Sequence, residues 1–352
     1  MHASLEKLIS PIKYFSGSYL RDWRRRAVEH GITVVVCYHR IVAPNCGASD
    51  DFAAEAGVSV DVFARHMEFL ARNFRSIPPS EASIPAPGQL RCAVTFDDGY
   101  LDNYTLAAPV LKRFGLTAGF FVCSDFVDTE RWFWWEAIAQ ALRKTRHTRF
   151  EAQRVFPEAV AEGRLDSAYL LEGQATRERA CKDLLAWLGR CPQGQIDAAL
   201  GRLVEALDIR PSASPRRTPL MDWFHLRELR RQGFEIGAHT ANHVNLAHAD
   251  PECLLSEMAV AHQRLEAESD GPIKSFAYPY GGREHLSQSA YEMAGRLGYP
   301  SAFTTVRGIA DGRHDPLLTP RIHLNPPWFF GCAYNVDDAF RRDRAAGFAI
   351  AG

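Results

Sequence analysis

The sequence lacks the features that mark several common protein classes. Its eight cysteines include no C-x-x-C pair, which disfavours a zinc knuckle or a dithiol redox motif. No apolar run approaches the roughly 20 residues of a transmembrane helix, and the first 26 residues contain no apolar run of signal-peptide length. We therefore expect buried free thiols in a reducing compartment and a cytoplasmic location.

The chain also lacks an excess of charge of either sign. Forty-one Lys and Arg face 42 Asp and Glu, which leaves a formal net charge of -1. No global electrostatic field would attract nucleic acid, so we expect no nucleic-acid partner. The 352 residues are 46% hydrophobic and 24% charged, which is an ordinary globular composition. This length allows two domains, or one large α/β barrel with an insertion.

Short apolar or β-branched runs recur along the chain and predict seven strands. Most of them are separated by amphipathic segments of helix length, an alternation typical of a parallel sheet with helices outside it. Seven such units favour a distorted, incomplete (β/α)7 barrel of the α/β class over an open sheet. The expected strands are Ile32–Cys37, Cys92–Phe96, Thr117–Val122, Phe234–Ala238, Ile273–Tyr278, Ala302–Val306 and Leu317–Leu324.

The barrel is expected to span residues 31–325, with one long interruption. Residues 124–219 carry no strong strand signal but several helix-compatible stretches, so we interpret them as a helical insertion. Residues 326–352 are expected to form a C-terminal tail. Three tryptophans near the start of the insertion would either line a sugar site or anchor the insertion to the barrel; they are Trp132, Trp134 and Trp135.

Residues 1–30 are expected to form a basic amphipathic segment. Aromatic and aliphatic side chains recur at helical spacing, beside a basic flank. Ser10 and Pro11 suit a helix N-cap and first position. The pattern leaves two interpretations open, a helix lying on a membrane surface or one docked on the domain or on a protein partner. The residues concerned are Ile12, Phe15, Tyr19 and Trp23, flanked by Lys13, Arg21, Arg24, Arg25 and Arg26.

Two adjacent carboxylates follow the second expected strand. The run from Ala93 to Phe96 leads directly into Asp97, Asp98 and a glycine. Parallel α/β folds place their chemistry at this end of the strands. One Asp could bind a metal while the other acts as a base, although the same pattern is typical of a turn that caps the next helix.

A pair of histidines follows the fourth expected strand. His239 comes at the strand end, and His243 follows four residues later. Two imidazoles at this spacing can bind one ion. Together with one carboxylate they predict an open metal site, for which we expect zinc, with cobalt, nickel, manganese and iron as alternatives.

The fifth expected strand ends in Tyr-Pro-Tyr-Gly-Gly. Its aromatic rings, Tyr278 and Tyr280, are candidate walls for a sugar ring, and the glycines would let backbone N–H groups approach a ligand. The same residues would also form an ordinary turn.

These motifs, in this order, resemble those of the polysaccharide deacetylases, carbohydrate esterase family 4, whose shared region is the NodB homology domain. The matching segments are Thr95-Phe-Asp-Asp-Gly99, His239-Thr-Ala-Asn-His243 and Phe276-Ala-Tyr-Pro-Tyr-Gly281, and Tyr38-His39-Arg40 is similar to the start of many bacterial members. The resemblance implies a distorted seven-stranded (β/α) barrel, in agreement with the strand count.

The resemblance also implies roles for individual residues. Asp98, His239 and His243 would hold a divalent metal, and Asp97 would be the general base. The backbone N–H of Tyr280 would help to bind the oxyanion. A late-strand histidine would protonate the departing amine, and His323 is the nearest match, with His39 and His314 as rivals.

Two positions depart from the family pattern. Where many members have an arginine that orients the catalytic Asp, this chain has Ala277, and Arg321 on the last strand is our candidate replacement. The match to the late-strand histidine is loose, and Asp311 or Asp315 would orient whichever histidine acts.

The resemblance implies a metal-dependent hydrolase that removes an N-acetyl group from an amino sugar of a glycan or glycan precursor. The expected cytoplasmic location favours an intracellular, lipid-linked intermediate of surface polysaccharide or lipopolysaccharide assembly, with the enzyme at the inner face of the membrane. One alternative is a deformylase, O-deacetylase or cyclic amide hydrolase on the same barrel. Another is an inactive sugar-binding module, which the presence of all four metal and base residues disfavours.

Overall fold

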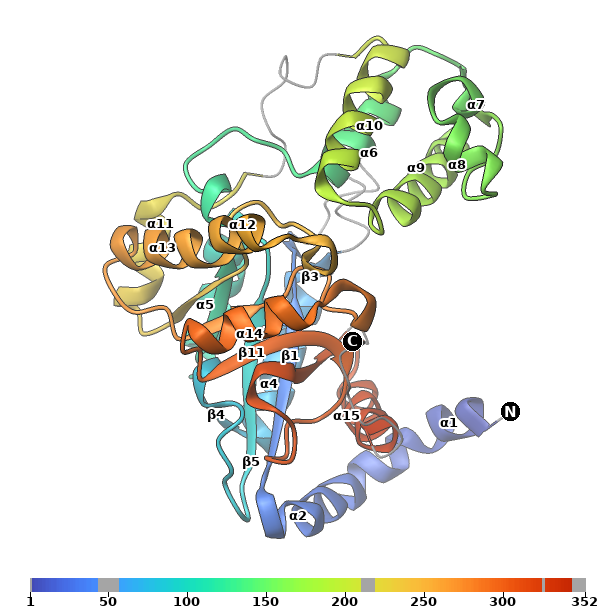
Figure 1. Cartoon of the computed structure of the whole chain (residues 1–352). Helices are drawn as coiled ribbons and strands as arrows, with labels where there is room; N and C mark the ends of the chain where they lie inside the picture. Colours follow the sequence, from blue (N-terminus) through green and yellow to red (C-terminus); the bar gives the residue numbers. More distant parts are fainter. Residues whose placement is uncertain (1, 44–56, 210–218, 325–326, 344–352) are drawn as a thin grey trace. The chain divides into compact units, whose positions relative to one another are not determined.

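Seven parallel strands form a closed ring in the computed structural model, which describes residues 2–43, 57–209, 219–324 and 327–343 (Figure 1). The ring closes because β1 pairs with β5 as well as with β12. All seven expected runs become strands, so the predicted barrel is confirmed. In hydrogen-bonding order the strands are β1 (Ile32–Tyr38), β12 (Thr319–His323), β11 (Ser301–Arg307), β10 (Ser275–Ala277), β9 (Glu235–Ala238), β6 (Ala118–Val122) and β5 (Leu90–Phe96).

Side chains that alternate along these strands form two hydrophobic layers, since residues two apart on a strand share a face. One set fills the barrel interior and includes Val35, Ala93, Phe121, Ala277 and Phe303. The other set packs under the surrounding helices and includes Val34, Val36, Val94, Phe120 and Phe276. This alternation decides which residues at the strand ends face the barrel axis.

The helices outside the barrel follow the expected amphipathic segments. Two of these segments contain a π-helical turn, so that each is a composite of shorter helices rather than one regular helix. The helices are α4 (Val60–Asn73), η2 (Asn103–Ala107) with α5 (Ala108–Arg113), α11 (Trp223–Arg231), α12 (Pro251–Leu254) with η6 (Leu255–Val260) and α13 (Ala261–Glu268), and α14 (Gln288–Arg296).

Short elements complete the connections of the barrel. A two-residue strand, β4 (Arg75–Ser76), extends the sheet beside β5, and β2 (Ile41–Val42) pairs with β3 (Val58–Ser59). The 3₁₀ turns are η1 (Pro79–Glu81), η3 (Ser124–Phe126), η5 (Leu246–His248), η7 (Arg283–His285) and η8 (Pro316–Leu318).

The two chain ends pack together on the barrel. Helices α1 (His2–Phe15) and α2 (Ser18–His30) lie beside α15 (Phe329–Asp343), and the Ser10 hydroxyl donates to the Phe330 carbonyl over 2.7 Å (Figure 1). The region expected as a tail therefore contains a helix that docks on the body. The expected N-cap at Ser10 is wrong, because α1 begins at His2 and continues through Pro11.

The aromatic stripe of the N-terminal segment is divided between the core and the surface. Tyr19 and Trp23 are buried, and the Trp23 ring stacks on Phe74 at a centroid distance of 5.6 Å. Ile12 and Phe15 are 70% and 79% exposed. The docking interpretation therefore holds for Tyr19 and Trp23 of α2. It does not hold for Ile12 and Phe15, whose side chains lie on the exposed face of α1.

A second compact unit, which we call the insertion unit, comprises the described residues 130–209. It begins later than the expected residue 124, because the amides of Ser124 and Asp125 donate to the carbonyls of Thr240 and Ala241 in the barrel unit. It is mainly helical with one small hairpin: α6 (Trp134–Lys144), β7 (Arg149–Phe150), α7 (Ala152–Val155), α8 (Pro157–Ala161), β8 (Tyr169–Leu170), α9 (Gln174–Leu188) and α10 (Gln193–Ala206).

Two expectations concern the described chain as a whole. None of the seven cysteines in the described segments forms a disulfide, in agreement with the predicted thiols; Cys46 lies outside these segments. Within the same segments, no helix combines the length and the apolar character that a membrane span requires.

Candidate active site

The candidate site lies at the carboxyl ends of the barrel strands, where parallel folds place their chemistry. Asp97 and Asp98 follow β5, and His239 follows β9. Backbone bonds continue the strand pairing to these positions, since the Asp97 amide donates to Tyr38 and the His239 amide donates to Val122. These backbone hydrogen bonds thus fix the position of the two aspartates relative to His239.

Asp98, His239 and His243 come together as one buried cluster. The Asp98 Oδ1 atom lies 3.5 Å from the Nε2 atoms of both His239 and His243. One ligand atom from each residue lies within 4.8 Å of the others. All three side chains are nearly inaccessible, so that a cation between them would have few competing water ligands.

The donors of this cluster fit a divalent metal. Within the described chain, Asp98 Oδ1 is buried and has no hydrogen-bond partner, which is costly unless a cation approaches it. The His239 Nδ1–H donates to the Ala277 carbonyl over 2.7 Å, which leaves its Nε2 atom facing Asp98. Burial lowers the pKa of His243 to about 3, so this imidazole is neutral, as a metal ligand must be.

The loop that carries the second histidine is held by a residue that the sequence reasoning missed. The Glu257 carboxylate accepts hydrogen bonds from the backbone amides of Ala241 and Asn242, at 3.0 and 2.8 Å. The His243 amide donates to the Thr240 hydroxyl over 2.9 Å, and both residues have a positive φ. A glutamate on the buried side of its helix was the available signal, because such residues are rare without partners.

Asp97 is bound to a guanidinium rather than to the histidine pair. Arg321 donates from its two terminal nitrogens to the two carboxylate oxygens, at 2.8 and 2.7 Å, and both side chains are buried. The Arg321 Nε–H also donates to the Thr304 carbonyl over 2.9 Å, which fixes the orientation of the guanidinium. The contact suggested for Arg321 in place of the missing motif arginine is therefore present.

The two adjacent aspartates have different electrostatic surroundings. Burial would raise the pKa of Asp97, but Arg321 outweighs it and holds that pKa well below the usual range. Burial also opposes ionisation of Asp98, but the nearby imidazoles of His239 and His243 lower its pKa. Asp98 has a φ of 75°, which turns its side chain away from that of Asp97. Both are carboxylates at neutral pH.

His39 and His323 face each other across the site. Their rings are nearly parallel, with centroids 5.8 Å apart. Burial, followed by the charges of His39 and Arg321, lowers the pKa of His323 to about 4. Either imidazole is placed to exchange a proton near Asp97.

The other candidates for the acid step lie elsewhere. His314, Asp311 and Asp315 belong to the β11–β12 connection, in which Ala310 pairs with Thr33 at the start of β1. This is the amino end of the barrel strands, opposite the site. Asp311 pairs with Arg313, and Asp315 accepts from the Tyr291 hydroxyl, so neither orients His39 or His323.

Of the two motif tyrosines, only Tyr280 borders the cluster. Its ring meets that of His243 edge-on, at a centroid distance of 4.8 Å. The expectation for Tyr278 is wrong, because its side chain is fully buried against Phe276 in the layer under the helices. Strand alternation places Tyr278 on the outer face with Phe276 while Ala277 faces inward. Tyr280 lies beyond the end of β10, in a turn where its own φ is 61°.

Comparison with known proteins agrees with this geometry. The family model described as Polysaccharide deacetylase matches residues 86–153 and 198–301. A curated Bacillus subtilis (strain 168) protein, "Putative polysaccharide deacetylase YxkH", is 41% identical over 66 residues, which are 17% of this chain and 24% of that protein. The aligned part of the chain thus spans about a quarter of this relative.

Two solved structures share the fold. Streptococcus pyogenes deacetylase PplD in complex with acetate is 18% identical with a TM-score of 0.51, over 84% of this chain and 94% of that one. BC0361, a polysaccharide deacetylase from Bacillus cereus, is 17% identical with a TM-score of 0.52, over 87% and 69%. The family match over residues 86–153 and 198–301, together with the three motifs in this barrel, identifies a polysaccharide deacetylase domain in this chain.

Proposed function

We propose that this protein is a metal-dependent hydrolase that removes an N-acetyl group from an amino sugar of a glycan or glycan precursor. The observation that carries the proposal is that two adjacent carboxylates have different partners. Asp98 faces two imidazoles in a buried metal-binding arrangement, while Asp97 is held apart by Arg321. A metal site and a separate base are the two parts that metal-assisted hydrolysis of an amide uses.

Each group in the site has a defined task in this reaction. A divalent metal held by Asp98, His239 and His243 would supply a Lewis acid that polarises the acyl carbonyl and acidifies water. Asp97 accepts the proton of the attacking water, and Arg321 keeps the carboxylate ionised and oriented. The Tyr280 backbone N–H donates to the developing oxyanion. His323, with His39 beside it, delivers a proton to the departing amine.

The test is acetate release from N-acetylated sugars by metal-loaded protein, measured together with the bound metal. Asp97→Asn should keep the metal and lose turnover by about 100-fold or more, whereas Asp98→Asn and His239→Ala should lose both. Asp311→Asn, at the opposite end of the barrel, is the matched control. Release of formate, or opening of cyclic amides, without acetate release would replace the N-acetyl assignment by an alternative on the same barrel.

We further propose that the substrate is a lipid-linked saccharide and that the protein works at the cytoplasmic face of a membrane. Support comes from α1, where the adjacent Ile12 and Phe15 are exposed at 70% and 79%. Three exposed arginines, Arg21, Arg24 and Arg25, lie on the neighbouring α2. An apolar pair beside a basic flank suits a surface of anionic lipid.

The position of this surface relative to the site also supports the proposal. Ser10 of α1 is hydrogen-bonded to Phe330, which follows His323 by seven positions in the sequence. Seven extended residues span at most about 25 Å, which limits the distance between His323 and the helix that carries the apolar pair.

Vesicle binding tests the membrane contact. The wild-type protein should sediment with vesicles rich in phosphatidylglycerol and not with vesicles of phosphatidylcholine alone. A double variant, Ile12→Ser with Phe15→Ser, should lose this binding, whereas Phe224→Ser should retain it, because Phe224 is a comparably exposed ring on α11. Equal binding by both variants would contradict the proposed contact.

A further inference from the structure

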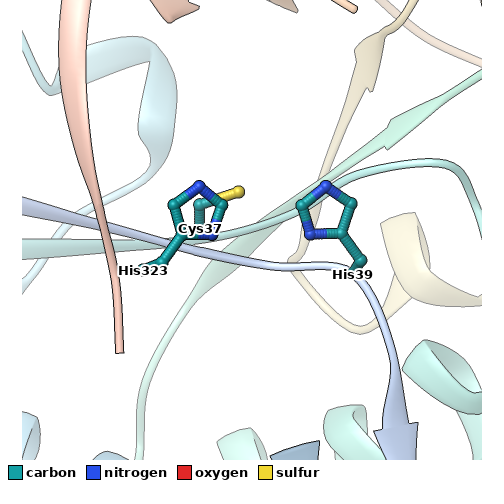
Figure 2. Close-up of side chains that lie close together, drawn as sticks. All are labelled: Cys37, His39 and His323. Atoms are coloured by element: carbon teal, nitrogen blue, oxygen red, sulfur yellow. The ribbon is translucent and has the colours of Figure 1, made fainter. Parts of the chain in front are cut away.

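A second cluster of metal-binding side chains lies beside the first. Figure 2 shows the Cys37 thiol and the rings of His39 and His323 gathered at the ends of β1 and β12. Cys37 is the registered partner of His323 in the parallel β1–β12 pair, and His39 follows two residues after Cys37. One ligand atom from each of the three residues lies within 4.8 Å of the others.

The three donors match a cation that favours sulfur and nitrogen. Zinc binds thiolates at about 2.3 Å and imidazoles at about 2.0–2.1 Å, so donors around one ion lie roughly 3–4 Å apart. Modest side-chain rotations would close the cluster to that size. Within the described chain, neither His39 nor His323 uses a ring nitrogen in a hydrogen bond, and the thiol makes only long contacts, to Asp97 Oδ2 at 3.5 Å and to the Tyr38 carbonyl at 3.9 Å.

We propose that Cys37, His39 and His323 form a second, inhibitory site for a thiophilic divalent cation of the zinc class. Binding replaces the thiol proton, which passes to solvent, and occupies a lone pair on each imidazole. His39 and His323 could then no longer protonate a leaving amine. The ion would also sit beside Asp97 and draw the base away from water.

This site uses none of the three residues of the Asp98 cluster, so the two can be separated by substitution. Equilibrium dialysis against Zn²⁺ should give two ions per wild-type chain, and one ion per chain for either Asp98→Ala or Cys37→Ser. With Co²⁺, the near-ultraviolet thiolate-to-cobalt band should persist in Asp98→Ala and disappear in Cys37→Ser. Cys253→Ser, a half-buried thiol in the same unit, is the matched control and should keep the band.

The inhibitory effect rests on the proposed hydrolase activity and is measured separately from binding. Acetate release should rise with the first equivalent of Zn²⁺ and fall with the second. In Cys37→Ser the second phase should require about 100-fold more zinc. His323→Gln should independently remove the cobalt band, which guards against a misfolded Cys37 variant.

The outcomes distinguish this inference from the proposed function. A cobalt–thiolate band with no hydrolysis of any tested substrate would support the second site and count against the hydrolase. Hydrolysis with a single zinc ion per wild-type chain, or a band that survives in Cys37→Ser, would overturn the second site. Two bound ions with undiminished acetate release would overturn its inhibitory role.

Discussion

Arg321 donates two parallel hydrogen bonds to Asp97, one from each terminal nitrogen of its guanidinium to one carboxylate oxygen. The pair is buried, with no measurable exposure of Arg321. Such bidentate pairs fix orientation as well as charge. At the position where the resemblance implies an arginine, this chain has Ala277, whose carbonyl accepts from His239. In the proposed mechanism, Arg321 on the last strand orients the base instead.

The first prediction concerns the pH dependence that Arg321 controls. Because this guanidinium holds the pKa of Asp97 well below its usual range, Arg321→Gln should raise that pKa. The acidic limb of the kcat/KM profile should then move to higher pH, since more Asp97 is protonated at any given pH. We expect about a 100-fold loss at pH 6, partly recovered at pH 9, with Arg313→Gln as an unaffected control. An acidic limb that stays in place would contradict the assignment of Asp97 as base.

The same pair predicts a stability effect. Breaking a buried ion pair on one side leaves an uncompensated charge and costs about 3–5 kcal/mol. Arg321→Gln should therefore unfold at lower urea concentration than wild type at pH 7. The folded-state pKa of Asp97 is depressed, so the pair stabilises the protein above the unfolded pKa of Asp and loses this effect as pH falls. The difference between variant and wild type should consequently shrink in acid.

A second acid effect is predicted for His323. Its pKa of about 4 lies below its unfolded value near 6.5, so between these values the unfolded chain binds a proton that the folded protein does not. Metal-free protein should lose stability on the order of 2 kcal/mol over this interval, and His323→Gln should lose correspondingly less. Urea titrations at pH 7, 5.5 and 4.5 measure the difference, and parallel curves for the two proteins would be evidence against the depressed pKa.

Gly281 is predicted to fix the backbone of Tyr280. Its φ is 60°, and an added Cβ would lie 2.6 Å from the Thr305 amide nitrogen. Gly281→Ala should displace the strand end, cost about 1–3 kcal/mol and reduce kcat by about 100-fold. Gly298→Ala is the control, because it shares a positive φ of 75° but has open space around it. Equal effects on kcat from both substitutions would remove the proposed role of this turn.

The two halves of the N-terminal segment are predicted to differ in their contribution to folding. Trp23 is buried against Phe74 and Phe340, so Trp23→Ala should destabilise the protein by about 3–5 kcal/mol. Phe15→Ala, at an exposed position, should change stability by no more than about 0.5 kcal/mol. Thermal or urea unfolding of both variants measures this. Similar losses for the two would mean that α1 packs on the body through Phe15.

Much of the fold follows from the sequence because each barrel strand is buried on both faces. Continuous apolar runs such as Ile32–Cys37 therefore mark strands, but they do not determine the register between strands. The helix α15 was not predicted, since its packing partners, Tyr14 and Trp23, are distant in the sequence. The predicted helix start at Ser10 and Pro11 was wrong for a related reason. Tertiary contacts of α1 with α15 outweigh the local preference of proline for a helix start.

The candidate site, like the fold, was predicted only in part from the sequence. Motif spacing brings Asp98, His239 and His243 to the same end of the barrel, because parallel strands align their carboxyl ends. The error at Tyr278 was avoidable by alternation, since Ala277 must face inward if Phe276 faces the helices. The position of Cys37 beside Asp97 required the three-dimensional register of β1, β5 and β12, which no local pattern contains.

One measurement tests the central claim that metal binding and base catalysis are divided between two adjacent carboxylates. Bound metal and acetate release are determined in parallel for wild type, Asp97→Asn and Asp98→Asn, on the same N-acetylated sugars. We predict that Asp97→Asn retains the ion of the Asp98 cluster without turnover, while Asp98→Asn loses that ion and turnover together. Full acetate release by Asp97→Asn, or an unchanged metal content in Asp98→Asn, would contradict the account.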